Sequence, residues 1–470
     1  MRNLHLVVLV ASTGLVSCVR YRPAPLDPPG LAAGYRARQL SDGALRQFMT
    51  SAAIEVPEDS EWHPRHLSLV ALYFHPELDF ARASWHEAAA AEITAGARPP
   101  LSADGTVNHA ARPDEGKTTS WSVSLGTAMT LETGGKRGAR LAGARAGTLA
   151  ARLRLETTAW QVAEDAARAA IAAVSADGDL KSAEAEQATL DRVLALLRAR
   201  YAQGAASLTE VARAEGDLQA ATVSVLSAQR ERTAARAELA RAVGLPVAEV
   251  DSLSIGFETA SHCAILDSVA VPALERRALL TRADVGTELA AYAEAEGELR
   301  VAVAEQYPGL SLGPGIGWEQ GIGRWSLGLG LSKIVLNRNR GPIAEAEARR
   351  EGAAVRFAEV QQNALREVAS GAAECQGARV EEAQADTLFR GAARRLALAQ
   401  AAYQRGETGE TEVAFAQLGL VRAQHTRDLA TRRLAAAQLG LERAVGAWLG
   451  ASAPHWPDLT QPARPTIPDP

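Results

Sequence analysis

The sequence predicts an α+β membrane protein with an internal duplication. Three observations support this prediction: four segments alternate between apolar and small or polar residues, two stretches of about 65 residues favour helix, and the chain matches itself at an offset of 202 residues. The 470 residues carry a net charge of −5, which excludes a nucleic-acid binder driven by bulk basicity. A hydrophobic content of 47% excludes wholesale disorder.

Residues 1–17 have the features of a lipoprotein signal peptide. Arg2 supplies a positive charge, and Leu4–Val16 form an apolar run that is too short to span a bilayer. The run ends in Leu15-Val16-Ser17-Cys18, which resembles a bacterial lipobox and implies that Cys18 becomes the lipidated first residue of the mature chain. The alternative is an incidental cysteine, but the charge, apolar run, small residue and cysteine occur in the order that lipidation requires.

The segment that follows Cys18 predicts an anchored linker. Residues 18–33 are rich in proline, and we expect Tyr21 to Gly30 to be extended. Val19 stands where an aspartate would favour the inner membrane, so the outer membrane is the expected location. Two or more acyl chains attach a protein stably. No later apolar run approaches 18 residues, so any further crossing of the membrane would need β-strands.

The self-match indicates two copies of one large unit. Tyr201 to Gly244 aligns without gaps to Tyr403 to Gly446, with 18 identities across 44 positions. We predict a first repeat over residues 34–246, a second repeat over residues 247–450 and a flexible C-terminal tail over residues 451–470.

Four segments of period two predict strands, at about 101–108 and 120–131 in the first repeat and about 310–318 and 324–336 in the second. Each segment has one apolar face and one face of small or polar residues. Trp121, Trp318 and Trp325 lie near strand ends, as interfacial aromatic residues do. A soluble sheet stays open as an alternative. In a membrane, four strands cannot close a barrel with room inside, so several chains would contribute to one barrel.

The helical stretches are too long for a compact domain. Arg137–Tyr201 and Pro342–Tyr403 each favour helix, with an expected irregularity at Ser175–Leu180, where Asp177-Gly178-Asp179 weakens the pattern. Gly204 and Gly406 predict tight turns, which are followed by return helices over Ser207–Val243 and Glu410–Leu449. A plain antiparallel coiled coil would explain the helices, but it would explain neither the strands nor the duplication.

From about Gly34 to Gly450 the chain resembles the TolC-like outer membrane efflux proteins. Arg200–Val211 is similar to the family's helix-hairpin tip, and Tyr403–Val413 is similar but has Gly409 and Glu410 where the first tip has serine and leucine. Ile334–Gly341 looks like the strand-to-helix junction of the CzcC-like heavy-metal branch. The resemblance implies a homotrimer, in which each protomer gives four strands to one β-barrel that continues as a long periplasmic α-helical barrel.

The resemblance also implies partners and site residues. A periplasmic adaptor protein and an inner-membrane transporter are the expected partners, besides outer membrane lipid. The adaptor would dock at the two tips, through Tyr201, Gly204, Ser207, Leu208, Glu210, Val211, Tyr403, Gly406, Glu412 and Val413. Glu412 would also occupy the family's first acidic gate position, and Phe415 stands where the family has an aspartate. Three copies of Glu412 would attract cations, and three copies of Phe415 would narrow the pore.

The leading functional hypothesis is an exit duct for passive export of small solutes by a tripartite efflux pump in the bacterial outer membrane, with heavy-metal cations as one suggested cargo. The alternatives are the duct of a type I protein secretion system and a non-conducting structural lipoprotein of the periplasm.

We do not predict an enzyme, a cofactor or a metal site. The glycine-rich Gly313–Gly317 lies in a strand pattern, and nothing else resembles a phosphate-binding loop. His63 and His66 lack a third ligand. Cys263 and Cys375 are compatible either with a disulfide or with two free thiols.

Overall fold

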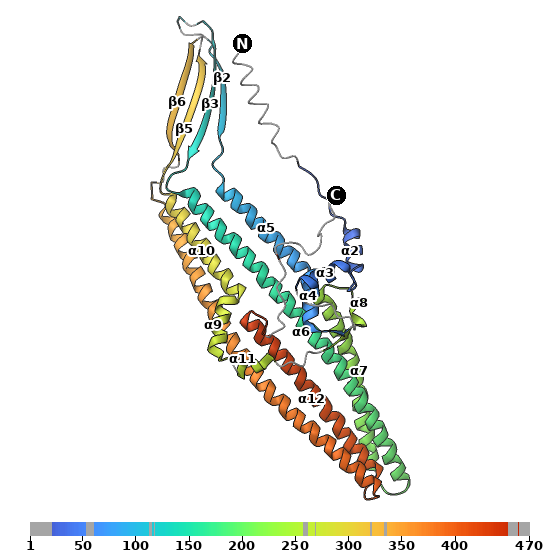
Figure 1. Ribbon diagram of the computed structural model, residues 1–470. Coiled ribbons are helices and arrows are strands. Elements are labelled where there is room, and N and C mark those ends of the chain that lie inside the picture. Colours follow the sequence, from blue (N-terminus) through green and yellow to red (C-terminus); the bar gives the residue numbers. More distant parts are fainter. Residues whose placement is uncertain are drawn as a thin grey trace.

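The computed structural model describes residues 21–52, 61–111, 115–116, 118–256, 262–267, 269–319, 322–332, 336–449 and 459. A four-stranded sheet lies at one end of an elongated helical body, and two helical hairpins form the other end (Figure 1). The elements in chain order are α2 (Pro28–Arg36), α3 (Gly43–Ser51), β1 (Glu61–Trp62), α4 (Pro64–Phe74), α5 (Pro76–Gly96), β2 (Ser102–His109), β3 (Trp121–Leu131), α6 (Lys136–Ala202), α7 (Leu208–Val243), α8 (Val247–Asp251), β4 (Ser254–Ile255), the 3₁₀ helix η2 (His262–Asp267), α9 (Val271–Thr281), α10 (Ala283–Ala304), β5 (Gly309–Glu319), β6 (Ile322–Ser332), α11 (Arg340–Gln404) and α12 (Glu410–Val445).

The predicted linker is helical at its C-terminal end. The stretch that we expected to be extended as far as Gly30 is non-helical only up to Asp27, because Pro28 and Pro29 begin α2. Proline suits the first turn of a helix, where its missing N–H is not needed. Cys18 and the signal peptide lie outside the described residues.

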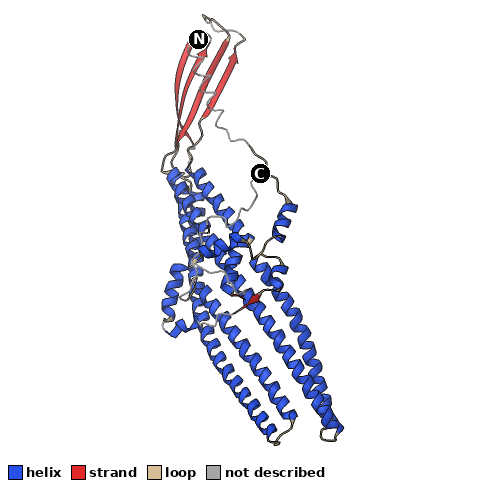
Figure 2. Cartoon of the chain, turned by 45° about the vertical axis from the view of Figure 1, so that its right-hand side comes forward, coloured by secondary structure: helices blue, strands red, loops and turns tan. Residues whose placement is uncertain are grey.

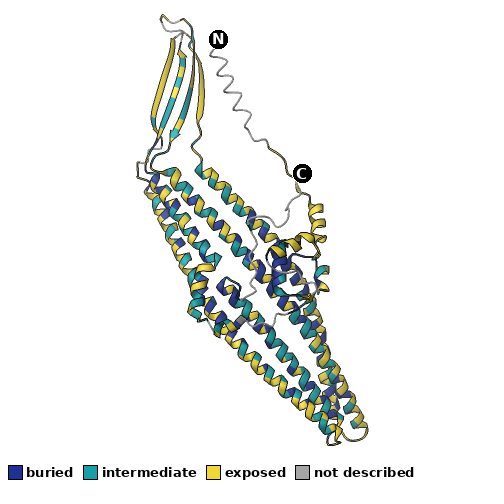
Figure 3. Cartoon of the chain, in the orientation of Figure 1, coloured by how far each residue is buried: buried dark blue, intermediate teal, exposed yellow. Residues whose placement is uncertain are grey.

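Each repeat has its own hydrophobic core at the middle of the body, where short segments pack on the long helices. The first core joins α3 and α4 to α6 and α7, and almost every residue of α4 is buried. Its α6 side is a row of small residues, including Ala159, Ala163 and Ala170, which lets neighbouring helices approach closely. The second core joins η2 and α9 to α11 and α12. Figure 3 shows this burial at the middle of the helices, whereas the sheet is exposed or only half-buried.

The predicted irregularity in the first long helix is wrong, because α6 runs unbroken from Lys136 to Ala202. Distant arginines stabilise the Asp177-Gly178-Asp179 stretch. Arg232 of α7 donates to Asp177 at 2.9 Å, and Arg236 also binds this carboxylate. Arg432 of α12 donates to the carbonyl oxygen of Ser175 at 2.8 Å and to Asp179 at 2.5 Å.

Glycine in the left-handed conformation ends the helical hairpins where the repeat predicts it. Gly204 and Gly406 turn the chain at the tips, with φ of 71° and 73°. Gly244 and Gly446 follow the return helices, with φ of 73° and 67°. The second return helix therefore ends at Val445, four residues before its predicted end.

The four predicted strands form one antiparallel sheet in the order β2-β3-β5-β6. Three of them match the predicted segments to within one or two residues. The fourth strand, predicted to reach residue 336, ends at Ser332, and Leu336 already lies in the turn before α11. Arg338 and Asn339 both adopt a φ of 54° in this turn, which a strand does not allow. Residues 333–335 lie outside the described residues.

Candidate functional site

The register of the sheet brings the apolar residues of all four strands onto one face. Leu125 of β3 pairs with Ile316 of β5, which pairs with Trp325 of β6. The neighbouring row on the other face is small and polar: Thr106 pairs with Ser124, and their hydroxyl oxygens lie 2.6 Å apart. The predicted division into an apolar face and a small polar face is therefore confirmed.

Neither face of this sheet is covered by a helix in the described part of the chain (Figure 2). Every residue of β2 is exposed, and large apolar side chains of β6 such as Leu329 remain 69% exposed. The edge strands β2 and β6 each have only one neighbouring strand. Exposed apolar surface together with free edges is costly in water, and both features mark surfaces on which further contacts can form.

Aromatic residues gather at the end of the sheet that is farthest from the helices. Trp121 begins β3, Trp318 comes one residue before the end of β5, and Trp325 lies near the start of β6. His109, at the end of β2, places its ring 4.6 Å from that of Trp121. β3, β5 and β6 each have 11 residues, the length that a tilted membrane strand needs, and β2 has 8.

The first tip joins α6 to α7 and is closed by a capping box. The backbone N–H of Glu210 donates to Ser207 Oγ at 3.2 Å, and the Glu210 carboxylate accepts from the backbone N–H of Ser207 at 2.7 Å. These backbone and side-chain hydrogen bonds from Ser207 hold the pKa of Glu210 below its ordinary value. Leu208 is 63% exposed beside this cap, whereas Val211 is buried between the helices.

The second tip, between α11 and α12, lacks that cap. Gly409 stands at the position of Ser207 and has no side chain to accept from the helix. Glu410 and Glu412 lie in the first turn of α12, where carboxylates are favoured by the helix dipole. Tyr201 and Tyr403 are about half exposed at the two tips, and Val413 is partly buried.

The two candidate gate residues lie on α12 just after the second tip, and both are about half exposed. Glu412 is not isolated, because its carboxylate lies 3.7 Å from Nη1 of Arg200 on α6 of the same chain. The nearby Glu410 pairs with Arg192 of α6 at 2.5 Å.

The ion pairs between the two repeats could not be predicted from the sequence. Along α6 and α12 they continue from the tip into the body, through Arg422 with Glu186 at 2.7 Å and Arg432 with Asp179 at 2.5 Å. The partners are more than 200 residues apart in sequence, so no local spacing reveals them. The pairs link one hairpin to the other along their length.

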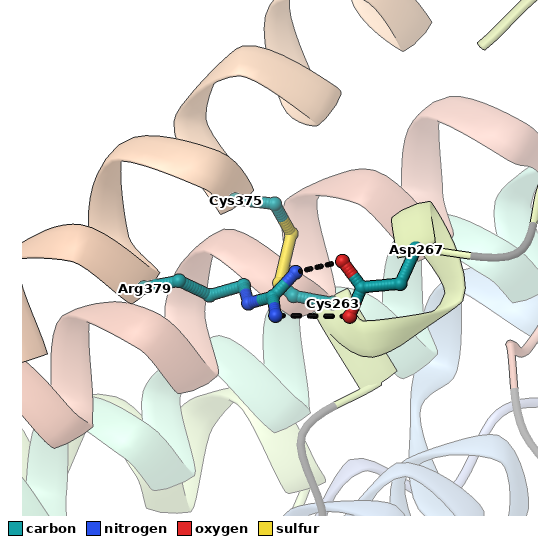
Figure 4. The surroundings of a disulfide bond; sticks show 4 residues. All are labelled: Cys263, Asp267, Cys375 and Arg379. Carbon is teal, nitrogen blue, oxygen red and sulfur yellow. Dashed lines mark hydrogen bonds and ion pairs between the residues drawn. A yellow bond between two sulfur atoms is a disulfide. The ribbon is translucent and has the colours of Figure 1, made fainter. Parts of the chain in front are cut away.

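Cys263 and Cys375 form a disulfide that ties η2 to α11 (Figure 4). Both cysteines are fully buried in the second core. Beside the disulfide, Arg379 donates two hydrogen bonds to Asp267, at 2.8 and 2.9 Å, and this lowers the pKa of Asp267. The sequence left open whether these cysteines are free.

The histidines that we considered as metal ligands cap a helix instead. The backbone N–H of His63 donates to Nδ1 of His66 at 3.1 Å, at the start of α4. Among the described residues there is no group of three or more histidine, cysteine, aspartate or glutamate side chains that could hold a metal ion. None of the helices in the described ranges combines the length and the apolar character that a membrane span requires.

Solved structures of known proteins have the same fold. VceC, an outer membrane protein of Vibrio cholerae, superposes with a TM-score of 0.67 at 22% identity, covering 82% of this chain and 96% of that one. CusC superposes with a TM-score of 0.65 at 20% identity, covering 82% of this chain and 92% of that one. The Campylobacter jejuni outer membrane channel CmeC superposes with a TM-score of 0.66 at 14% identity, covering 94% of this chain and 96% of that one. No curated protein sequence matches the chain.

The duplication also appears in the comparison with protein families. A model named outer membrane efflux protein matches residues 75–245 and again residues 274–447. The two matches fall in the two predicted repeats and together cover well over half of the chain. The similarity to TolC-like proteins is thereby confirmed, and the chain belongs to the outer membrane efflux protein family.

Proposed function

We propose that this chain is the protomer of a homotrimeric outer membrane channel, which serves as the passive exit duct of a tripartite efflux pump. Three copies would supply twelve strands to one barrel and would join their long helices into a periplasmic tunnel. An inner-membrane transporter would provide the energy, and a periplasmic adaptor would connect it to the duct. Lipidation of Cys18 would anchor each chain in the outer membrane.

The uncovered four-stranded sheet carries this proposal. Its apolar face, its two free edges and its tryptophan-rich end fit a segment of barrel wall in lipid. The opposite face is small and polar, as the lining of a water-filled pore should be. In the helical body beyond the sheet, α6 has 67 residues, which corresponds to a length of roughly 100 Å. Such a helix is long enough for a tunnel that extends well away from the membrane.

Small solutes are the proposed cargo. The similarity of Ile334–Gly341 to the CzcC-like junction makes heavy-metal cations the first class to test. In this proposal residues 34–246 and 247–450 are the two repeats, and selection of the cargo occurs upstream because nothing in the described residues resembles a metal site.

Conductance of the purified protein in a planar bilayer tests the duct and its gate together. The parent should give discrete single-channel steps. Glu412→Gln should lower the preference for cations, and Phe415→Ala should raise the conductance, because the proposed gate combines an acidic ring with an apolar constriction. If neither the parent nor the Phe415→Ala variant conducts, the duct is wrong and a structural lipoprotein is favoured. Two variants that conduct like the parent would place the constriction elsewhere.

Docking of the adaptor at the tips is best tested at Leu208. Replacing Ser207 would also remove a helix cap, whereas Leu208 is exposed and contributes little to folding. We expect Leu208→Ala to reduce cross-linking to the adaptor several-fold without changing thermal unfolding. Leu226→Ala is a matched control, because Leu226 is 57% exposed on the same helix but lies well away from the tip. Equal cross-linking of both variants would contradict docking at this tip.

A further inference from the structure

The segments that connect the sheet to the helices form a band of positive charge. We define this junction band as residues 96–101, 131–140, 303–310 and 336–341, which contain six basic and two acidic side chains, a net charge of +4. The whole chain has a net charge of −5. The basic residues are Arg98, Lys136, Arg137, Arg140, Arg338 and Arg340.

Most of this charge is not neutralised by the residues that the structure describes. Among them, Arg140 alone of the six has a carboxylate partner, Glu132, which it binds through both terminal nitrogens. Lys136 donates to the carbonyl oxygen of Tyr307 at 2.5 Å, and Arg137 donates to the carbonyl oxygen of Gly96 at 2.6 Å. Both acceptors are neutral, so these hydrogen bonds do not offset the positive charges.

Three further arginines of the junction band point into solvent. Arg98, Arg338 and Arg340 are exposed, and in the described ranges no carboxylate lies within ion-pair distance of any of them. Exposed guanidinium groups can form paired hydrogen bonds with phosphate.

A strained turn holds part of this band in place. Arg338 and Asn339 are the only non-glycine residues with positive φ among those described. The Asn339 side chain is buried and donates to the carbonyl oxygen of Ala302 at 2.8 Å, and its backbone N–H donates to Asn337 Oδ1 at 3.1 Å. Two successive left-handed residues are unfavourable unless their surroundings fix them. The turn therefore keeps Leu336 and Arg338 on the surface at a cost in local energy.

Apolar side chains lie exposed among these charges. Leu101 is 63% exposed, Tyr307 is 56% exposed and Leu336 is 92% exposed. Basic side chains next to exposed apolar and tyrosine side chains are typical of surfaces that contact lipid headgroups. The described residues at the far end of the sheet differ, since Arg324 there pairs with Glu319 at 3.1 Å and three tryptophans lie near the strand ends.

We propose that the junction band binds the headgroups of anionic phospholipids in the membrane leaflet nearest the helices. This inference rests on the proposed function, because it requires the sheet to stand in a bilayer. The band lies directly where the exposed apolar face of the sheet ends, so the surface that contacts acyl chains continues into one that contacts phosphates. The two ends of the sheet thus differ in charge, which fixes the depth of the barrel in the membrane.

Native mass spectrometry of the full-length protein, delipidated in neutral detergent and then given phosphatidylglycerol or phosphatidylcholine, tests the proposal. The parent should retain phosphatidylglycerol preferentially. The triple variant Arg98→Ala, Arg338→Ala, Arg340→Ala should lose this preference, by about fivefold for each arginine removed. The control triple variant Arg213→Ala, Arg356→Ala, Arg394→Ala removes the same charge from exposed helix positions elsewhere and should behave like the parent.

Two further measurements test whether the effect depends on charge and not on folding, and whether the ligand is a lipid and not free phosphate. A triple arginine-to-lysine variant keeps the charge and should keep most of the preference for phosphatidylglycerol. Excess inorganic phosphate should not displace the lipid, because it lacks the acyl chains that contact Leu101 and Leu336. Equal retention of the two lipids by the parent, an unchanged preference in the triple alanine variant, or displacement by inorganic phosphate would each overturn the proposal.

Conductance of the same samples in a zwitterionic planar bilayer distinguishes this inference from the proposed function. If the parent conducts but shows no lipid preference, the proposed lipid binding by the junction band is wrong, and the proposed function as a duct is unaffected. If neither the parent nor the Phe415→Ala variant conducts, the duct itself is wrong, and the inference that rests on it is overturned with it.

Discussion

Gly178 shows how one residue decides whether a long helix is weak or stable. A glycine in mid-helix ordinarily costs about 1 kcal/mol relative to alanine. Here the absent side chain leaves room for the guanidinium of Arg432, which a Cβ at this position would meet directly. Arg432 is 6% exposed and binds α6 on either side of Gly178. The glycine therefore favours contact between the two repeats over local helix stability.

Gly178→Ala should consequently destabilise the protein in spite of the better helix propensity of alanine. Displacing Arg432 leaves a buried charge and two acceptors poorly satisfied, at a cost of about 1–2 kcal/mol. Thermal unfolding followed by circular dichroism measures the change. Gly216→Ala is the matched control, because Gly216 lies on α7 with nothing near its missing Cβ and should gain up to about 1 kcal/mol. If both variants gain stability, the role given to Gly178 is wrong.

At the scale of elements, the sequence predicts the strands well because alternation encodes both the strand and its two faces. The register then aligns Leu125, Ile316 and Trp325 in one row, as the pattern requires. The sequence does not predict features that depend on contacts between residues far apart in the chain. The continuity of α6 depends on arginines of α7 and α12, and Glu412 pairs with Arg200 of another helix. No window of sequence contains both partners of these contacts.

The two faces of β6 predict opposite responses to the same substitution. Leu327 and Ser326 are neighbours at the middle of the strand and point to opposite faces. Leu327→Arg should reduce the amount of protein assembled in the outer membrane, since arginine at the bilayer midplane costs about 2–4 kcal/mol. Ser326→Arg, on the polar face, should assemble normally. Fractionation of membranes by density measures both amounts, and equal assembly of the two variants would contradict a lipid-facing apolar side.

At the scale of the whole molecule, the duplication is the feature that the sequence predicts best. The left-handed glycines at 204 and 244 recur at 406 and 446, as the offset of 202 demands. The disulfide could not be predicted in this way, because only the second repeat has the cysteines. Their positions in η2 and α11 are 112 residues apart, and only the fold brings them together.

The disulfide should contribute strongly to stability because it closes a long loop. A loop of this size reduces the entropy of the unfolded chain by an amount equivalent to about 4–5 kcal/mol in the chain-entropy model. The double variant Cys263→Ala, Cys375→Ala should therefore unfold at a lower temperature than the parent. A reducing agent should destabilise the parent and leave the double variant unchanged. If the parent is insensitive to full reduction, the disulfide does not hold the second core together.

The order and direction of the four strands also determine how copies of this sheet can meet. β2 leads away from the helices and β6 leads back to them, so the chain enters and leaves the sheet at the same end. When β6 of one copy pairs with β2 of the next, the new pair is antiparallel, the apolar faces stay on one side and all helices extend in one direction. An antiparallel pair of two β6 edges would send the helices to opposite ends, and a parallel pair would exchange the two faces. In the proposed channel the contact between copies would therefore be head-to-tail, the geometry that closes into rings by rotation, and every such ring would have a uniform antiparallel wall and a fixed polarity.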